Sequence, residues 1–274
     1  MPELPEVETV AKALQRALTG RSVASVAFLG KTRLPFDAGA AARALKGKTF
    51  TGVRRRAKYL ILDFDCERVL LAHLGMTGYF HIDPSDEERH LHDRIVFGLD
   101  GGDELRYADA RRFGFVALAR RDGDDGLPAE LSHLGPEPLE RRFCAKAMLE
   151  RATGRKAPVK VFIMDQEVVV GVGNIYASEA LFAAGVDPRR PAGSLSLAEW
   201  TRLVAEVKAV LRRALRSGGS TIRNYRTVDG SEGGFQRVLK VYGKTRENCP
   251  ACGSEVRVIR LGGRSTFFCP ECQR

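Results

Sequence analysis

Four cysteines close to the end of the chain constrain its folding most strongly. Cys249, Cys252, Cys269 and Cys272 form two C-x2-C pairs separated by 16 residues. This spacing is typical of structural zinc sites, in which four thiolates complete a tetrahedron and leave no position for water. We therefore predict one Zn²⁺ ion that folds this segment and takes no part in chemistry. A redox pair of C-x2-C motifs is the alternative.

The residues between the two cysteine pairs predict a β-hairpin. The runs EVRVIR and STFFC flank Gly262 and Gly263, which supply a turn, and Arg264 follows at its tip. An arginine on a zinc-held turn is a suitable ligand for phosphate. A solvated turn residue is the alternative interpretation of Arg264.

Charge is distributed unevenly along the 274 residues, whose formal net charge is +10. Residues 1–150 carry 23 basic and 23 acidic side chains, whereas residues 151–274 carry 21 and 11. A basic half beside a neutral half favours a polyanionic partner, with nucleic acid ahead of an anionic membrane. The sequence shows neither a signal peptide nor an apolar run of the ~18–20 residues that a membrane span needs. We therefore expect a cytoplasmic protein.

The hydrophobic pattern changes twice along the chain. Residues 5–18 predict an amphipathic helix, and short β-branched runs between Arg21 and Arg120 favour an antiparallel sandwich or barrel. Residues 122–138 are rich in glycine and proline and predict a linker. Helices are then expected at 144–153, at 156–165, and from Gly173 or Asn174 to Gly185. A longer helix is expected from Ser196 to Gly218, and Ser196 with Glu199 forms a capping box at its start.

Loop motifs carry residues that suit duplex DNA. GVGNIYASE places Asn174 at a helix start, where unpaired backbone N–H groups can receive a phosphate, and Lys156 lies upstream. Asn174 as a simple helix cap is the alternative. HLGMTG holds Met76, and DARRFG holds Arg111 and Phe113. Side chains of these kinds can fill the space left by an extruded base, although each also fits ordinary packing or surface roles.

Further motifs occur in order across the whole chain: MPELPEVETV, RRAKYLIL, HLGMTG, HDRIVF, RRFG, GVGNIYASEALF, GGSTIRNY, GGFQ, VYGK and the terminal cysteine segment. Together they resemble bacterial formamidopyrimidine-DNA glycosylases, which remove oxidised purines such as 8-oxoguanine. Endonuclease VIII-type glycosylases share the architecture but usually open PEGPE. The opening PELPE of this chain favours the purine-directed branch.

The resemblance implies an α+β multidomain fold. We expect an N-terminal catalytic antiparallel β-sandwich with a leading helix at 1–121 and a linker at 122–138. A helix-two-turn-helix DNA-binding domain with a lesion-capping loop is expected at 139–235. A C-terminal four-cysteine zinc finger with a β-hairpin is expected at 236–274.

The resemblance makes Pro2 the nucleophile. Removal of Met1 frees a secondary amine, and an α-amino group titrates near pKa 7.7–8.0, so a neutral fraction exists at pH 7. Its attack on C1′ displaces the base and leaves an iminium that permits β- and δ-elimination. Glu3 resembles the general acid, with Glu6 in support; a charge at a helix N-terminus is the alternative role for Glu3. A retained Met1 would block the amine and leave the molecule inactive.

The resemblance assigns roles to other positions as well. Lys58 matches the lysine linked to the first elimination, and Arg264 matches the residue linked to the second. The positions that match DNA contacts are His73, His92, Arg111, Lys156 and Asn174. The positions that match the void-filling triad are Met76, Arg111 and Phe113. The lesion-capping loop matches Gly218, Gly219, Ser220, Thr221, Ile222, Arg223, Asn224 and Tyr225. The chain departs from the pattern at Arg94, where relatives often have histidine, and at Thr77, where some have an acidic residue.

We therefore expect a monomeric DNA glycosylase and AP lyase that acts on damaged double-stranded DNA and associates with the bacterial nucleoid through DNA. Two alternatives remain open: an endonuclease VIII-like glycosylase for oxidised pyrimidines, and a non-catalytic DNA-binding zinc-ribbon protein. The second explains the charge and the cysteines but leaves Pro2, Glu3 and Lys58 without a role.

Overall fold

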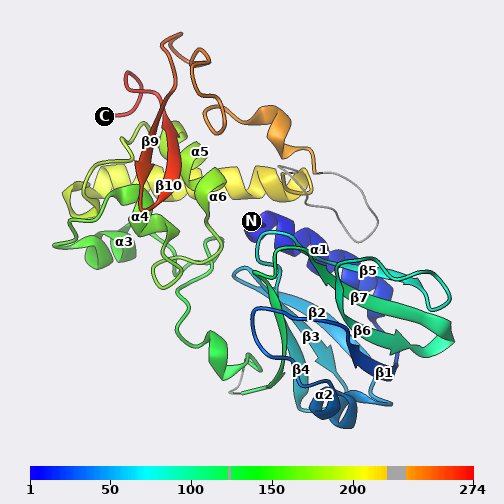
Figure 1. Cartoon of the computed structure of the whole chain (residues 1–274). Helices are drawn as coiled ribbons and strands as arrows, with labels where there is room; N and C mark the ends of the chain where they lie inside the picture. Colours follow the sequence, from blue (N-terminus) through cyan, green and yellow to red (C-terminus); the bar gives the residue numbers. More distant parts are fainter. Residues whose placement is uncertain (123–124, 221–232) are drawn as a thin grey trace. The chain divides into compact units, whose positions relative to one another are not determined.

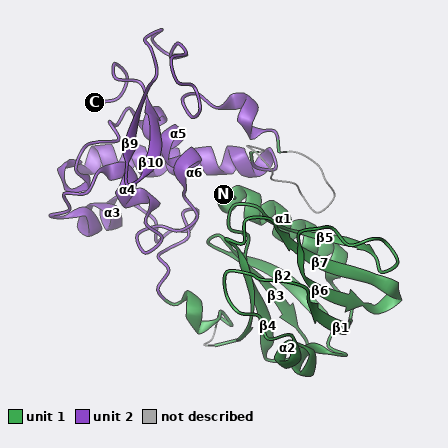
Figure 2. Ribbon diagram, in the orientation of Figure 1, with its two compact units in different colours: residues 1–132, 220–233 green, residues 133–219, 234–274 purple. Residues whose placement is uncertain are grey.

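The computed structural model describes residues 1–122, 125–220 and 233–274 (Figure 1). They form two compact units (Figure 2). The first contains residues 1–132 with Ser220 and Gly233, and the second contains residues 133–219 and 234–274. Within the described ranges, no helix combines the length and the apolar character that crossing a membrane requires.

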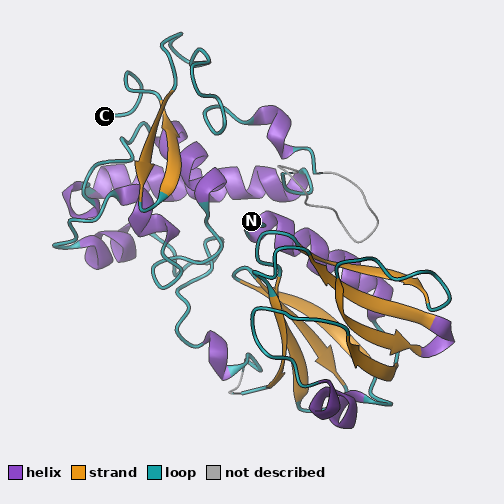
Figure 3. Cartoon of the chain, in the orientation of Figure 1, coloured by secondary structure: helices purple, strands orange, loops and turns teal. Residues whose placement is uncertain are grey.

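The first unit is an antiparallel β-sandwich with a leading helix, as predicted (Figure 3). Helix α1 (Leu4–Leu18) precedes two four-stranded sheets, ordered β1-β6-β7-β5 and β2-β3-β4-β8. The strands are Val23–Phe28 (β1), Phe50–Arg56 (β2), Tyr59–Phe64 (β3), Arg68–His73 (β4), Gly78–Pro84 (β5), Asp93–Leu99 (β6), Asp103–Asp109 (β7) and Phe115–Arg120 (β8). Short 3-10 turns cover Asp100–Gly102 and Ala129–Leu131.

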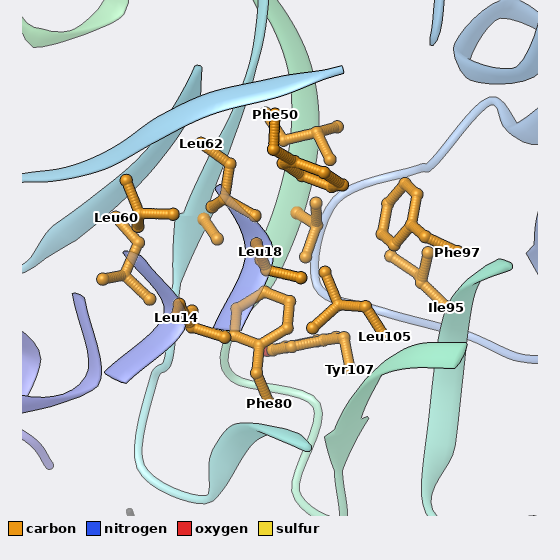
Figure 4. Packing of buried hydrophobic residues seen from close by; sticks show 14 of the residues in the cluster. Leu14, Leu18, Phe50, Leu60, Leu62, Phe80, Ile95, Phe97, Leu105 and Tyr107 are labelled. Carbon is orange, nitrogen blue, oxygen red and sulfur yellow. The ribbon is translucent and has the colours of Figure 1, made fainter. Parts of the chain in front are cut away.

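The two sheets and α1 share one apolar core (Figure 4). Leu14 and Leu18 from α1 are fully buried in it, as are Leu60 and Leu62 from β3. These four side chains follow the helical and strand periods, so one face of α1 and one face of β3 line this core. The core therefore fixes α1 on the sandwich.

Helix α2 (Ala38–Leu45) of this unit was not predicted from the sequence. It lies within the range expected to be all strand, and Asp37 caps it, with its Oδ1 accepting a hydrogen bond from Ala40 N at 2.8 Å. Alanines favour a helix, and the aspartate satisfies one of its free N–H groups. Strand β2 lies within the range expected to hold strands, although its arginine-rich second half hides the alternation, with Val53 buried and the arginines half-buried.

The second unit contains four α-helices and the cysteine hairpin. The helices are Ala145–Ala152 (α3), Val159–Met164 (α4), Asn174–Ala184 (α5) and Leu197–Arg216 (α6), with 3-10 turns at Ala192–Ser194 and Phe235–Val238. Helix α4 begins three residues later than expected because Pro158, in an extended conformation, precedes it. Helix α5 ends at Gly185 with φ 69°, and Ser196 with Glu199 forms the predicted capping box of α6.

The cysteine segment forms the predicted hairpin, which packs against α5 within the second unit. Strands β9 (Arg257–Leu261) and β10 (Arg264–Phe268) are joined by Gly262 and Gly263, whose φ values are 54° and 75°. Two successive positive φ angles match the twist of a tight hairpin and favour glycine. The predicted fold class is confirmed.

Candidate active site and nucleic-acid interface

The start of α1 gathers the first predicted site residues. Pro2 is buried, and Glu3 is 3% exposed directly before the helix. The Glu6 carboxylate accepts a hydrogen bond from Glu3 N at 2.8 Å and another from Ser220 N at 2.7 Å. Glu6 therefore connects the N-terminal residues with Ser220, the third residue of the predicted loop GGSTIRNY, which lies far away in the chain.

Helix α1 is held against the strand that leads to Lys58. Glu8 Oε2 accepts a hydrogen bond from Arg55 Nε at 2.8 Å, and Gln15 accepts one from Val53 N. Lys58 follows Ala57, whose φ of 55° forms the turn between β2 and β3, and Lys58 is only 6% exposed. The ion pair between Glu8 and Arg55 thus brings the first half of α1 and the Lys58 turn to the same region of the sandwich.

His73 lies beside this turn in a defined tautomer. Tyr59, next to Lys58, pairs with His73 across the β3–β4 ladder. The Nδ1 atom of His73 accepts a hydrogen bond from Gly75 N at 3.0 Å, so the ring proton resides on Nε2. Burial, and then the positive charge of Lys58, lower the pKa of His73 to about 4. His73 is therefore neutral at pH 7 and can donate through Nε2–H to an acceptor such as a phosphate oxygen.

The three predicted void-filling side chains occupy two turns of the sandwich. Met76 is 40% exposed between β4 and β5, and Phe113 is 46% exposed between β7 and β8. The guanidinium carbon of Arg111 lies 4.6 Å from the centroid of the Phe113 ring, within the range of a cation–π contact. Both apolar side chains remain exposed on turns, where a ligand can reach them.

Another predicted DNA contact, His92, is exposed directly before β6. Its Nδ1 lies 3.4 Å from an Nη atom of Arg94, and Arg94 Nε donates to the carbonyl oxygen of Asp109 at 3.2 Å. The departure at Arg94 thus adds a cation beside His92 and ties it to the turn that follows Asp109.

His81, Asp83 and His90 form a separate group of possible metal ligands, near the start of β6. His81 Nδ1 is 2.6 Å from Asp83 Oδ2, and its Nε2 is 2.8 Å from Asp93 Oδ1, so both ring nitrogens are engaged. Arg106 Nη1 lies 3.3 Å from the same Asp83 oxygen, where its charge would repel a cation. We therefore interpret the group as a hydrogen-bond network that holds the segment before β6.

In the second unit, Asn174 is the first residue of α5, and Gly173 occupies the cap position. Lys160, which is 1% exposed, donates from Nζ to Asn174 Oδ1 at 2.7 Å and to Thr266 Oγ1 at 2.8 Å. Asn174 Nδ2 donates to the carbonyl oxygen of Ser265 at 2.9 Å. These bonds connect the start of α5 with the hairpin strand that begins at Arg264.

Lys160 was not singled out by sequence reasoning, because a lysine in an apolar run resembles a surface residue of a helix. Only its flanking Val159 and Val161 hint that it is buried. Arg264 and Lys156, by contrast, are exposed, as expected for side chains that bind phosphate. Both remain predictions as DNA contacts.

Glu179 of α5 was likewise missed. Its buried carboxylate accepts three backbone hydrogen bonds, from Lys240, Val241 and Tyr242, at 2.8–2.9 Å. A carboxylate with three N–H donors is a strong local anchor. It fixes on α5 the segment that leads to the cysteine hairpin.

The four cysteines come together as the zinc prediction requires. Their sulfur atoms all lie within 4.8 Å of one another, with Cys249 and Cys272 separated by 3.9 Å and Cys252 and Cys269 by 3.4 Å. A tetrahedron with Zn–S bonds of about 2.3 Å has sulfur atoms about 3.8 Å apart. The arrangement therefore fits one structural Zn²⁺ ion with four thiolate ligands.

The predicted lesion-capping loop lies largely beyond the part that the structure describes. Gly218 and Gly219 have φ values of 70° and 81° after α6, and Ser220 is 3% exposed. The residues of this prediction outside the described ranges are Thr221, Ile222, Arg223, Asn224 and Tyr225.

Comparison with known families covers nearly the whole chain. Residues 1–116 match the formamidopyrimidine-DNA glycosylase N-terminal domain, and residues 134–226 match the formamidopyrimidine-DNA glycosylase H2TH domain. Residues 246–274 match a zinc finger found in FPG and IleRS. The three matched segments follow the order of sandwich, helices and cysteine hairpin.

Individual proteins are similar over their full length. The formamidopyrimidine-DNA glycosylase of Laribacter hongkongensis is 49% identical over 275 residues, covering 100% of both chains. A Lactococcus lactis FPG mutant in complex with Fapy-dG containing DNA has a TM-score of 0.90 at 33% identity, with 100% of each chain covered. MutM in complex with carbocyclic 8-oxo-G containing DNA has a TM-score of 0.91 at 34% identity and the same coverage. The chain therefore belongs to the formamidopyrimidine-DNA glycosylase family.

Proposed function

We propose that this protein is a base-excision repair enzyme that removes oxidised purines from duplex DNA and cleaves the resulting abasic site. Full-length similarity to glycosylases, including ones solved with Fapy-dG and 8-oxo-G DNA, is the observation that carries this proposal. The exposed void-filling candidates and the basic second half of the chain support a duplex DNA substrate.

The proposed reaction begins at Pro2 after removal of Met1. The free imino nitrogen attacks C1′ of the damaged nucleotide, the C1′–N bond to the base breaks, and the base leaves with its electron pair and takes up the proton that the imino nitrogen loses. Glu3 donates a proton to the sugar ring oxygen, which opens the ring and yields an iminium. Its buried position beside Pro2 supports this role, and the Glu6 bond to Glu3 N supports a fixed backbone there.

The iminium then acts as an electron sink for strand cleavage. Loss of a C2′ proton and departure of the 3′ phosphate complete the β-elimination, and loss of the 5′ phosphate completes the δ-elimination. We assign Lys58 to the first step and Arg264 to the second. The burial of Lys58 beside the neutral His73 supports a lysine held in one position in this part of the sandwich.

DNA contacts are proposed for His73, His92, Arg111, Lys156 and Asn174, and for the lesion-capping loop 218–225. The four-cysteine zinc ion would hold the hairpin and supply no chemistry beyond folding. The bonds from Lys160 to Asn174 and Thr266 support a fixed hairpin next to α5. We further propose that the protein acts as a monomer in the bacterial cytoplasm and meets the nucleoid through DNA, since its relatives are bacterial DNA glycosylases.

The proposal is tested by comparing excision from duplexes that differ only in the lesion. Protein without Met1 should release 8-oxoguanine faster than thymine glycol and leave a one-nucleotide gap. Faster release of thymine glycol would favour the pyrimidine-directed branch. Binding without any cleavage would contradict an enzymatic function.

A further inference from the structure

One buried carboxylate lies between the two turns that carry the void-filling candidates. Asp109 is fully buried at the end of β7. Its Oδ1 accepts hydrogen bonds from Thr77 Oγ1 at 2.6 Å and Arg111 N at 3.2 Å. Its Oδ2 accepts from Gly114 N at 2.8 Å and from the Tyr107 hydroxyl at 3.4 Å. Four donors from both turns and the strand thus converge on a single side chain.

Thr77 links the turns a second time. Its Oγ1 donates to Asp109 and also accepts a hydrogen bond from Arg111 N at 3.1 Å. A single hydroxyl on the Met76 turn therefore contacts both the carboxylate and the backbone of the Arg111 turn. Valine has the same shape as threonine but can make neither of these bonds.

The two turns also touch through their backbones. A Cβ atom on Gly75, whose φ is 61°, would lie 2.4 Å from Gly114 N, and one on Gly114 would lie 2.2 Å from the Tyr107 hydroxyl. Arg112 adopts a φ of 58°, which is strained for a residue other than glycine. Close contact and a strained residue indicate that the bonds of Asp109 hold these turns in one conformation.

Tyr107 contributes a donor that persists over the whole physiological pH range. Burial, and then the charge of Asp109, raise the pKa of Tyr107. The phenol therefore stays protonated and keeps donating to the carboxylate. A buried carboxylate needs such donors, because without them its desolvation would be costly.

We propose that Thr77 and Asp109 form a clamp that fixes the two turns, and with them Met76, Arg111 and Phe113, so that these side chains enter the duplex as one preformed wedge. Both are positioning residues for extrusion of the damaged nucleotide, and the inference rests on the proposed function. Extrusion requires the damaged nucleotide to be unstacked and unpaired, which costs free energy. A wedge that must first be ordered would add its own entropic cost to that step.

The clamp predicts a substrate-dependent effect of Thr77→Val. Single-turnover rates are measured on two duplexes, one with 8-oxoguanine paired with cytosine and one with an abasic site that has no base to extrude. For Thr77→Val we expect a rate on the paired lesion that is about tenfold lower than that of the parent protein, which is the effect expected from losing one hydrogen bond to a charged group. On the abasic site the rate should fall by less than about twofold. Thr49→Val is the matched control, since Thr49 is a half-buried threonine of the same unit, bonded to Ser22 at 3.0 Å, and should change neither rate.

Equal rates for Thr77→Val and the parent protein on both duplexes would overturn the clamp, and so would equal slowing on both. A parent protein that cleaves neither duplex would instead refute the proposed function. The rate of amide hydrogen exchange in the DNA-free protein then tests the clamp independently of enzymatic activity. Thr77→Val and Asp109→Asn should each speed exchange at Arg111 and Gly114 at least about tenfold relative to Thr49→Val. Unchanged protection in both variants would overturn the clamp whatever the activity.

Discussion

The neutral state of His73 makes the stability of the first unit depend on pH. Above pH 6.5 the ring is unprotonated in both the folded and the unfolded chain, so unfolding takes up no proton there. Between pH 6.5 and 4 the unfolded chain binds a proton that the folded chain does not, because burial and Lys58 lower the folded pKa to about 4. The free energy of unfolding therefore falls as the pH falls through this window.

The size of this loss follows from the two pKa values. One pKa unit corresponds to about 1.4 kcal/mol, so the step from 6.5 to about 4 accounts for about 3 kcal/mol once the pH is below 4. At pH 5 about 2 kcal/mol of this loss should already be present. A loss of this size is a substantial part of the stability of an ordinary domain.

The assay is urea unfolding of the parent protein and His73→Gln between pH 7.5 and 4.5, followed by a signal from the sandwich. The glutamine side chain of the variant cannot titrate, so the difference between the two free energies isolates the His73 contribution. That difference should change by about 2 kcal/mol or more in favour of the variant as the pH falls to 4.5. Thr49→Val removes no titrating group, and its difference from the parent should stay flat. Parallel profiles for the parent and His73→Gln would refute the assignment of a neutral, low-pKa His73.

Other predictions concern anchors and the metal. Glu179→Ala should lower the free energy of unfolding of the second unit by about 3 kcal/mol or more, because three backbone donors lose their acceptor. Glu150 is exposed, and Glu150→Ala should change this free energy by less than about 0.5 kcal/mol. Chemical denaturation measures both values. Removing zinc with a chelator should abolish amide protection in β9 and β10 and weaken DNA binding, and a hairpin that stays protected would contradict a structural zinc site. Lys160→Met should reduce DNA affinity more than it reduces the rate at saturating DNA, because the lost bonds to Asn174 and Thr266 position a binding surface; equal effects on both would argue against this role.

Local sequence signals predicted most of the fold. The apolar stripe of α1, the capping box at Ser196 and the glycine pair at 262–263 are all confirmed, since each depends on neighbours within a few residues. Helix α2 was missed because its short alanine-rich run offers little apolar periodicity in a region otherwise full of strands.

The site was predictable only as a set of separate residues. The four-cysteine spacing and the ordered motifs identified many candidates, but no pattern showed which of them touch. Glu6 and Ser220 are 214 residues apart, and Thr77 and Asp109 are 32 apart. Such pairs depend on how the sheets and turns pack, and a buried polar side chain is recognisable only when its partners are known. For the same reason the tautomer of His73 required the position of Gly75 N.

The whole proposed reaction depends on one covalent bond, between the imino nitrogen of Pro2 and C1′ of the damaged nucleotide. Its most direct test is borohydride reduction of protein without Met1 on a duplex with 8-oxoguanine, followed by mass spectrometry of the cross-linked peptide. We predict a covalent adduct on Pro2 that is absent when Met1 is retained and abolished by Pro2→Gly. An adduct located on a lysine, or efficient excision with no trapped complex, would contradict this mechanism.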